Sequence, residues 1–247
     1  MDAVKTAKRT LDIFEAFATK QEPLTLSDLA RQIASPVSSC HGVISTLKAR
    51  GYVYMLDKRR YYPTRKLLDL GSRISPHDPV MERLLPHLEA LRKRTDETVL
   101  IGKREGDEIL YVMTLESAQT IRYSLHAGTR RPLHASAVGK ALLGTLPDER
   151  LAEELRSLKL KRFTDATLDA GGLLADLRRS RRRGYFVTRG EYDSGGMGVA
   201  RAFAVQSEMF AVGVAGPLER VKTRLEAVGR AVSDTAAAMA RAAAASA

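Results

Sequence analysis

The first 64 residues contain three short amphipathic segments followed by two strand-like segments, and this order restricts the fold more than any other feature of the chain. Residues 4–19 and 24–33 place apolar side chains at helical spacing. A third helix is expected from Ser35, as N-cap, and Pro36, in the first helical position, to a stop at Gly51. The segments YVYML and RYYPT then predict a hairpin turned at residues 57–60. Three helices and a basic-tipped hairpin indicate a winged helix-turn-helix.

The outward side of the third helix carries small or hydrogen-bonding side chains, which suits insertion into a DNA major groove about 12 Å wide. The basic tip of the hairpin would then bind phosphates beside the groove. Thr25 or Ser27 would cap the second helix. The candidate DNA-binding residues are Thr25, Ser27, Ser38, Ser39, His41, Ser45, Lys48, Lys58, Arg59 and Arg60. The alternative is a helical protein-interaction module whose charges are merely solvated.

Charge and composition narrow the class of protein. The formal net charge is +11, densest in the first 75 residues, which favours an anionic partner. The single cysteine cannot form an internal disulfide, and neither a leader nor a membrane-spanning stretch is apparent, so we expect a cytoplasmic protein.

The five histidines lack metal-ligand spacing, which predicts no metal site. Ser136 and Lys140 are four apart, whereas the acyl-enzyme motif requires S-x-x-K, so we expect no catalytic residues and no cofactor.

The remaining sequence predicts an α+β fold in which helices are segregated around a sheet. We expect a DNA-binding domain over residues 1–63, a linker helix over 64–77 and an effector-binding and oligomerisation domain over 78–247. Within this last domain, residues 80–97 should form a helix kinked or broken at Pro86. Residues 98–117 should form a hairpin, residues 120–128 should continue the sheet, and residues 218–243 should form one closing helix.

Several motifs together give the chain a family resemblance. They are RTLDIFEAF, LTLSDLARQIASPVSSCHGVISTLKARGYV, PLHASAVGKALL, RRRGYFVTRGEYDSGG and VAGPLERV. In this order they resemble the IclR-type transcription regulators, over about residues 4 to 235. The resemblance implies a winged helix that binds operator DNA, a dimerising linker helix, a GAF-like domain for a small metabolite, and dimers that often pair into tetramers. Members commonly carry an arginine at the position of Gly42.

The resemblance also implies an effector pocket at the start of the helix in HASAVGKALL. The residues that match it by motif position are Tyr123, Arg131, Ser136, Ala137, Val138, Thr188, Gly198 and Arg201. Arg201 allows two interpretations. Its side chain points to solvent at a sheet edge, or it lies in the pocket and binds a carboxylate of the effector. On the second reading the effector is a small organic acid, and Tyr123 would suit an aromatic one.

Two functions follow as hypotheses. The first is a ligand-responsive transcription regulator of a catabolic or metabolic operon, bound to double-stranded operator DNA as a homodimer or homotetramer. The second is a winged-helix module for protein assembly, whose C-terminal domain is structural and binds no effector. Binding to DNA that weakens steeply with salt would separate the two.

Overall fold

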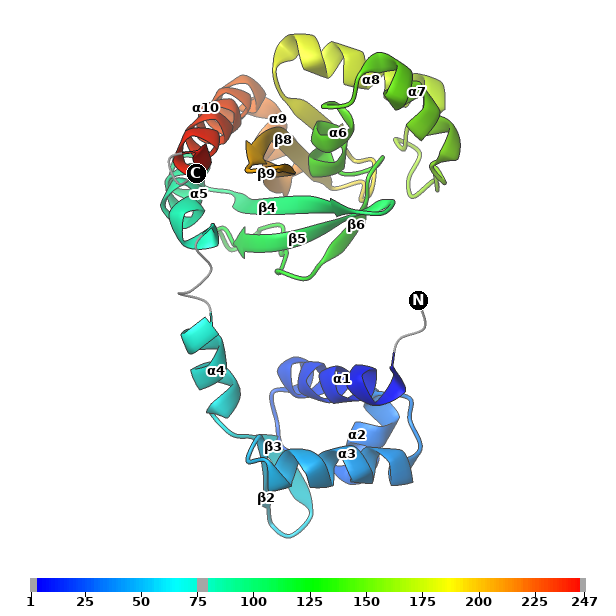
Figure 1. Cartoon of the computed structure of the whole chain (residues 1–247), viewed down its shortest axis with the longest axis vertical. Coiled ribbons are helices and arrows are strands. Elements are labelled where there is room, and N and C mark those ends of the chain that lie inside the picture. Colours follow the sequence, from blue (N-terminus) through cyan, green and yellow to red (C-terminus); the bar gives the residue numbers. More distant parts are fainter. Residues whose placement is uncertain (1–3, 75–79, 245–247) are drawn as a thin grey trace. The chain divides into compact units, whose positions relative to one another are not determined.

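The structure is a computed structural model, and it describes residues 4–74 and 80–244. The chain forms two compact units, Met1–Asp78 and Pro79–Ala247, which are described separately (Figure 1). Part of the linker helix expected over residues 64–77 falls in the segment SPHDP, which lies outside the described residues.

The first unit is a three-helix domain with a small antiparallel sheet in the order β1-β3-β2. Its elements are α1 (Lys5–Lys20), β1 (Leu24–Thr25), α2 (Leu26–Gln32), α3 (Val37–Ala49), β2 (Val53–Leu56), β3 (Arg60–Pro63) and α4 (Lys66–Ile74). Ile13, Leu29 and Ile44 are almost fully buried where α1, α2 and α3 meet. The predicted winged helix-turn-helix is confirmed.

The start of α2 agrees with expectation, and the start of α3 differs from it by one residue. Thr25, not Ser27, caps α2 by accepting a hydrogen bond from the Asp28 amide, and the Asp28 carboxylate in turn accepts one from the Thr25 amide. Pro36 occupies the N-cap of α3 and Ser35 makes no cap, so the predicted start of this helix was one residue too early.

The turn of the wing, the β2–β3 hairpin, depends on two residues with left-handed backbone. Asp57 and Lys58 have φ values of 50° and 55°. The Arg59 amide donates to the Leu56 carbonyl across this turn at 3.0 Å. Consecutive left-handed residues match the twist of the flanking strands, and this geometry leaves the basic side chains at the tip.

The second unit contains a six-stranded antiparallel sheet in the order β6-β5-β4-β9-β8-β7. Its elements are α5 (Met81–Thr95), β4 (Thr98–Glu105), β5 (Glu108–Leu115), β6 (Arg130–Pro132), α6 (Ala137–Leu143), α7 (Asp148–Ser157), α8 (Ala170–Arg183), β7 (Phe186–Arg189), β8 (Gly196–Val205), β9 (Glu208–Pro217), α9 (Leu218–Thr223) and α10 (Leu225–Ala244). The predicted α+β class is confirmed.

Each face of this sheet packs against its own group of helices, as Figure 1 shows. On one face, α5 and α10 bury Val99, Ile101 and Val212. On the other face, α6, α7 and α8 bury Leu100 and Ala211. Successive strand residues alternate between the two faces. The sheet therefore separates two hydrophobic cores.

Two sequence predictions for this unit were wrong, and a third is narrowed. Residues 120–128 do not extend the sheet, whose next strand is β6. Of the kink and the break expected at Pro86, the structure excludes the break, because α5 continues through this residue. The closing segment is two helices, because α9 ends at Thr223 and α10 begins at Leu225.

Across the described residues, we find no helix with both the length and the apolar character needed to span a bilayer.

Candidate nucleic-acid interface and ligand cavity

The outer side of α3 is exposed and, beyond Val37 in the first turn, carries small or polar side chains. Ser38, His41, Ser45 and Lys48 are exposed and Ser39 is half-buried, whereas the opposite side of the helix, from Cys40 to Leu47, is buried in the domain core. Helical periodicity produces this division, since the four buried positions fall on one stripe. The exposed side presents hydroxyl, imidazole and ammonium groups that can bind base edges.

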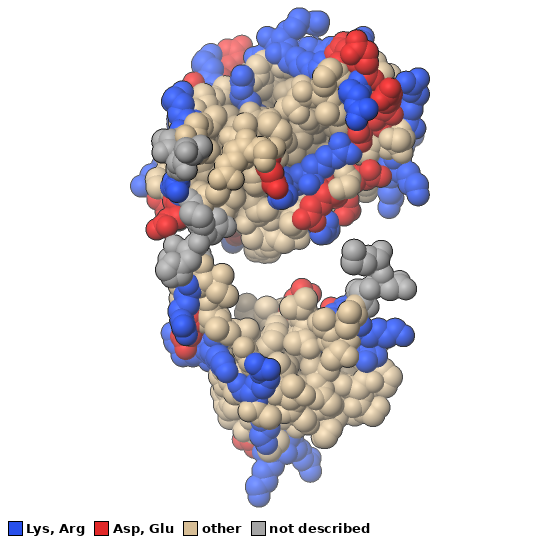
Figure 2. All heavy atoms as spheres, in the orientation of Figure 1, with Lys and Arg blue, Asp and Glu red and all other residues tan. Residues whose placement is uncertain are grey.

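The tip of the wing is strongly basic. Lys58, Arg59 and Arg60 are all exposed, and Figure 2 shows Lys and Arg side chains projecting from this end of the first unit. Arg60 forms an ion pair with Asp57. Lys58 and Arg59 make no ion pair with any residue that the structure describes. Two cations are therefore left to bind an anion outside the chain.

The start of α2 contributes less to this surface. Ser27 is exposed, but the Thr25 hydroxyl is occupied, because it donates to the Asp28 carboxylate at 2.6 Å while it caps the helix. These hydrogen bonds lower the pKa of Asp28. The structure thus gives Thr25 a structural role in α2.

A cavity of about 50 Å³ lies in the second unit between the sheet, the start of α6 and the loops around residues 123 and 192. Seven of the eight residues expected at an effector pocket line it. They are Tyr123, Arg131, Ser136, Ala137, Val138, Thr188 and Gly198. Ser136 also caps α6, since its hydroxyl accepts from the Gly139 amide at 3.0 Å. A Cβ at Gly139 would overlap the Leu133 carbonyl, so only glycine permits α6 to approach this closely.

Arg131 is the cation of the cavity wall. Its guanidinium carbon lies 4.5 Å from the centroid of the Tyr192 ring, and one nitrogen donates to the Arg130 carbonyl. Arg131 forms no ion pair within the described ranges 4–74 and 80–244. Stacking on an aromatic face holds a guanidinium in place without neutralising it. The cavity therefore contains a positioned positive charge.

Two acidic residues and a tyrosine complete the polar wall. The Asp193 carboxylate accepts from the Gly195 amide at 3.0 Å and from the Tyr123 hydroxyl at 3.4 Å. Burial, reinforced by the Asp193 charge, raises the pKa of Tyr123 to about 12, so this hydroxyl remains a donor at neutral pH. Glu191 is 6% exposed and also lines the cavity.

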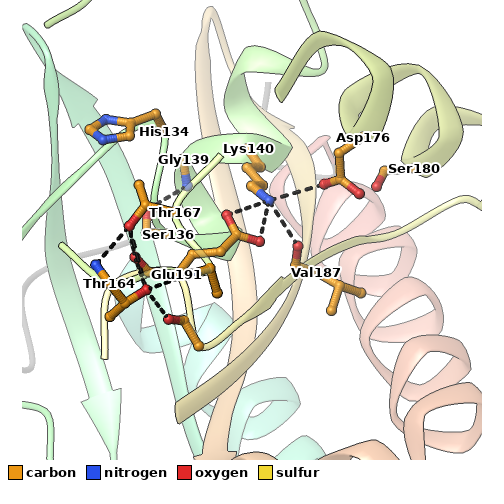
Figure 3. Close-up of polar contacts among 12 residues, drawn as sticks. His134, Ser136, Gly139, Lys140, Thr164, Thr167, Asp176, Ser180, Val187 and Glu191 are labelled. Carbon is orange, nitrogen blue, oxygen red and sulfur yellow. Dashed lines mark hydrogen bonds and ion pairs between the residues drawn. The ribbon is translucent and has the colours of Figure 1, made fainter. Parts of the chain in front are cut away.

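A buried lysine lies behind Glu191, as Figure 3 shows. Lys140 is fully buried, and its Nζ lies 2.6 Å from Oε1 of Glu191, 3.0 Å from Oδ2 of Asp176 and 3.2 Å from the Val187 carbonyl oxygen. Arg179 binds the other oxygen of Asp176 at 2.9 Å. A buried ammonium requires such pairing, because an isolated charge in the interior is strongly disfavoured.

The two carboxylates of this network differ in their titration. Burial raises the pKa of Glu191 and outweighs the attraction of Lys140. Burial acts in the same direction on Asp176, but Lys140 and Arg179 together lower its pKa. Asp176 has two cationic partners and Glu191 has one, which accounts for the difference.

Arg201 is the one expected pocket residue that lies outside the cavity. Along β8, Ala200 faces the core beneath α6, whereas Val199 and Phe203 face the core beneath α10. Arg201 shares the face of Val199 and Phe203, is exposed, and donates to the Gly184 carbonyl at the end of α8. Strand alternation thus overturns the pocket reading of Arg201, and the solvent-facing reading agrees with the structure.

Sequence reasoning overlooked Glu191, Tyr192 and Asp193 as cavity residues, although they lie inside the motif RRRGYFVTRGEYDSGG. It also overlooked the Lys140 network. The signal available was a single lysine in the otherwise apolar helix AVGKALL, which indicates a buried charge in need of partners. His134 is buried, and its Nε2 lies 2.9 Å from the Lys161 carbonyl oxygen. The described residues hold no group of side chains arranged for a metal ion.

Two domain families match the sequence of the chain. The IclR helix-turn-helix domain matches residues 6–56, and the bacterial transcriptional regulator IclR C-terminal domain matches residues 74–241. The regulator BhcR of Paracoccus denitrificans is 35% identical over 240 residues, which cover 94% of this chain and 85% of BhcR. The repressor AllR of Escherichia coli strain K12 is 30% identical over 217 residues, which cover 86% and 80% of the two chains.

Solved structures share the fold along nearly the whole chain. The crystal structure of IclR from Thermotoga maritima superposes with a TM-score of 0.80 at 25% identity, over 96% of this chain and 98% of that one. An IclR homologue from Microbacterium hydrocarbonoxydans, complexed with 4-hydroxybenzoate, superposes with a TM-score of 0.76 at 24% identity, over 98% and 100%.

Proposed function

The chain belongs to the IclR family of bacterial transcriptional regulators, whose members are regulators and not enzymes, and we propose that it binds operator DNA under the control of a small organic acid. The main support for an acidic ligand is Arg131. This cation lies in the cavity wall and has no carboxylate partner among the described residues. A planar guanidinium binds a carboxylate through two parallel hydrogen bonds.

The DNA-binding half of the proposal rests on the first unit. The exposed side of α3 would enter the major groove, where Ser38, Ser39 and His41 bind base edges. Lys58 and Arg59 of the wing would bind the backbone and supply affinity without sequence preference. Residues 1–63 thus form the DNA-binding domain.

The regulatory half rests on the cavity of the second unit. Its volume of about 50 Å³ favours a small ligand, and Tyr123 offers an aromatic ring to a planar one. 4-Hydroxybenzoate, bound by the Microbacterium homologue, is therefore one acid worth testing. Binding of such an acid would shift the protein between states with different affinity for DNA.

The proposed assembly of the protein depends on α4, which lies in the proposed linker region 64–77. One recognition helix reads only a few base pairs, so useful specificity requires two copies on two half-sites. α4 has no buried residue in the single chain, and Leu68 and Ile74 are 57% and 70% exposed. We infer a dimer that buries these side chains, pairs of which can form a tetramer. As a DNA-binding regulator it would act in the bacterial cytoplasm.

One experiment tests both halves. Binding to DNA from its own upstream region is measured by fluorescence anisotropy at increasing salt, with and without acetate, propionate, benzoate and 4-hydroxybenzoate. A regulator should lose DNA affinity steeply as salt rises, and an effector acid should change the affinity at constant salt. Binding that is insensitive to salt would favour the protein-assembly module, and a salt-sensitive protein indifferent to every acid would refute the acid effector.

A further inference from the structure

Residues 117–125, which lead from β5 toward β6, are attached to the second unit by side-chain hydrogen bonds. No hydrogen bond joins the backbone of this segment to another backbone group of the described chain. The segment nevertheless forms part of the cavity wall, because Tyr123 and Leu125 line the cavity. A segment held by few contacts opens at a lower free energy than a paired strand, so this part of the wall can move separately from the sheet.

The other loop in the cavity wall, residues 190–195, is fixed by its backbone. The Gly190 amide donates to the Gly196 carbonyl at 2.9 Å, and the Leu218 amide donates to the Gly195 carbonyl at 2.8 Å. Segment 117–125 is therefore the loop that moves at lower cost. A cavity of about 50 Å³ leaves little room for a ligand unless part of its wall can move.

Two hydrogen bonds join segment 117–125 to the junction between α5 and β4. The Thr98 hydroxyl donates to the Tyr123 carbonyl at 2.6 Å. The Ser117 hydroxyl donates to the Asp96 carbonyl at 2.8 Å. Both contacts attach the segment to residues that directly follow α5 in the chain.

A third hydrogen bond comes from Arg220 of α9, whose Nη1 donates to the Ile121 carbonyl at 3.0 Å. Nε and Nη2 of the same guanidinium donate to the two carboxylate oxygens of Glu97, each at 2.6 Å. The Glu97 side chain is 2% exposed. A Cβ at Gly216 would overlap this carboxylate, so the glycine makes room for it. Bidentate pairing with a buried carboxylate fixes the plane of the guanidinium and thereby aims Nη1 at Ile121.

The Arg220–Glu97 ion pair also connects segment 117–125 to the end of α5. Glu97 lies two residues beyond the last residue of this helix, Thr95. Arg224, directly after α9, donates to the Thr95 carbonyl at 2.8 Å. In sequence, α5 is the first helix after the proposed linker region 64–77. A displacement of the segment therefore acts on the helix of the second unit that is nearest in sequence to the DNA-binding domain.

We propose that residues 117–125 form a lid on the cavity, that the Arg220–Glu97 ion pair is its latch, and that opening of the lid loosens the end of α5. Arg220 and Glu97 are positioning residues, because both lie outside the cavity as the described residues define it and act through the lid. This inference goes beyond the proposed function, since it concerns how the cavity opens and not which ligand it binds. Its test needs no ligand, so failure of the acid effector would leave it standing.

Cysteine labelling measures opening of the lid in the full chain. Leu125 is 3% exposed, and the one native cysteine, Cys40, is buried in the first unit. In Leu125→Cys, the introduced thiol should react with N-ethylmaleimide each time the lid opens, and peptide mass spectrometry follows this reaction. Cys40 provides an internal reference in every variant.

Arg220→Lys in the Leu125→Cys background tests the latch. A single ammonium cannot pair with both oxygens of Glu97 and also reach the Ile121 carbonyl as the guanidinium does. Loss of a hydrogen bond from a charged donor should raise the labelling rate at residue 125 about tenfold. Hydrogen exchange of the amides in the last turn of α5 should become faster in the same variant. If Arg220→Lys fails to fold, Glu97→Gln weakens the same latch and gives the same test.

Two controls separate the lid from the stability of the whole unit. Leu155→Cys introduces a thiol on α7, where Leu155 is 6% exposed in the core beneath α6, and its labelling should not respond to Arg220→Lys. Arg178→Lys changes a surface arginine of α8 that pairs with Asp148, and it should leave labelling at residue 125 unchanged.

Three results would overturn the inference. Equal acceleration of labelling at residues 125 and 155 would show that the Arg220–Glu97 ion pair stabilises the whole unit and not the lid. Unchanged labelling at residue 125 in Arg220→Lys and Glu97→Gln would show that the ion pair is not a latch. Faster labelling at residue 125 with unchanged hydrogen exchange in α5 would refute the coupling to this helix.

Discussion

The ammonium group of Lys140 lies 3.0 Å from the carboxylate of Asp176, where neither side chain is more than 4% exposed. Lys140→Met would keep the length of the side chain but leave Asp176 and Glu191 without their shared cation. Removing one partner of a buried ion pair typically costs about 3–5 kcal/mol, and we expect a loss of that size in the free energy of unfolding. Urea denaturation of the wild type and of Lys140→Met at pH 7 measures this loss of stability, and a loss below about 1 kcal/mol would contradict the buried pairing.

The same substitution should make stability depend on pH in a defined direction. Burial already raises the pKa of Glu191, and loss of Lys140 removes the charge that opposes this shift. A carboxyl with a raised folded-state pKa binds protons more readily in the folded protein than in the unfolded chain, so its ionisation costs stability as pH rises above the ordinary carboxyl range. The loss in the free energy of unfolding caused by Lys140→Met should therefore become smaller as pH falls from 7 toward 5.

Substitutions in α3 and in the wing should affect DNA binding differently. Ser39→Ala or His41→Ala should change the preference among operator variants by about 1 kcal/mol or more, because these residues would bind base edges. Arg59→Ala should weaken binding to all sequences alike and reduce the salt slope by about one. Arg60→Ala serves as a comparison and should have a smaller effect, since Asp57 already neutralises that side chain. A wing variant that altered base preference would reverse the assignment.

Gly42 offers a test of how closely α3 approaches DNA. It lies inside the helix, is exposed, and an added Cβ would meet no atom within 4 Å. Gly42→Ala should therefore stabilise the domain by up to about 1 kcal/mol, the usual gain of alanine over glycine in a helix. We expect weaker operator binding from this more stable protein, because the new methyl group projects toward the groove. Equal or tighter DNA binding would show that the backbone at residue 42 does not approach the bases.

The apolar side chains of α4 should decide the oligomeric state. Leu68→Lys combined with Ile74→Lys should yield a monomer at micromolar concentration, because two charges would be buried in the proposed interface. Leu11→Lys is the matched control, since Leu11 is 63% exposed on α1 and lies outside that interface. Light scattering coupled to size exclusion distinguishes the two. A dimer that survives the double substitution would place the interface elsewhere.

Arg131 and Arg201 should respond differently to truncation. Arg131→Met should weaken acid binding at least tenfold, because it removes the cation of the cavity wall while retaining apolar bulk. Arg201→Ala should leave acid binding unchanged, since that guanidinium is bound to the Gly184 carbonyl outside the cavity. Calorimetry with the acid that binds wild type most tightly compares the two variants. Loss of binding in Arg201→Ala alone would contradict the cavity described above.

Local patterns predicted most of the fold because the forces behind them are local. The helices of the first unit follow from apolar periodicity, and the hairpin expected over residues 98–117 is formed by β4 and β5. Residues 120–128 were assigned wrongly because their alternating pattern reflects packing onto the cavity, not strand pairing. The Tyr123 carbonyl accepts from the Thr98 hydroxyl, so a side chain replaces the hydrogen bond of a neighbouring strand.

The cavity was only partly predictable for a different reason. Motif position identified the residues around the start of α6, but the Lys140–Glu191 pair joins positions 51 residues apart. Nothing in the local sequence reveals such a pairing. Arg201 was left with both a solvent and a cavity interpretation, because the sequence does not give the register of β8, which assigns each residue to one face of the sheet.

The division of the sheet into two cores has a mechanical consequence. Leu100 lines the cavity, while its neighbours Val99 and Ile101 pack beneath α5 and α10 on the reverse face. A ligand that displaces Leu100 must move the peptide units that also carry those two side chains. The path from the cavity to α5 therefore consists of one layer of backbone and the side chains of Val99 and Ile101, and a change of shape on one side of the sheet is transmitted directly to the other.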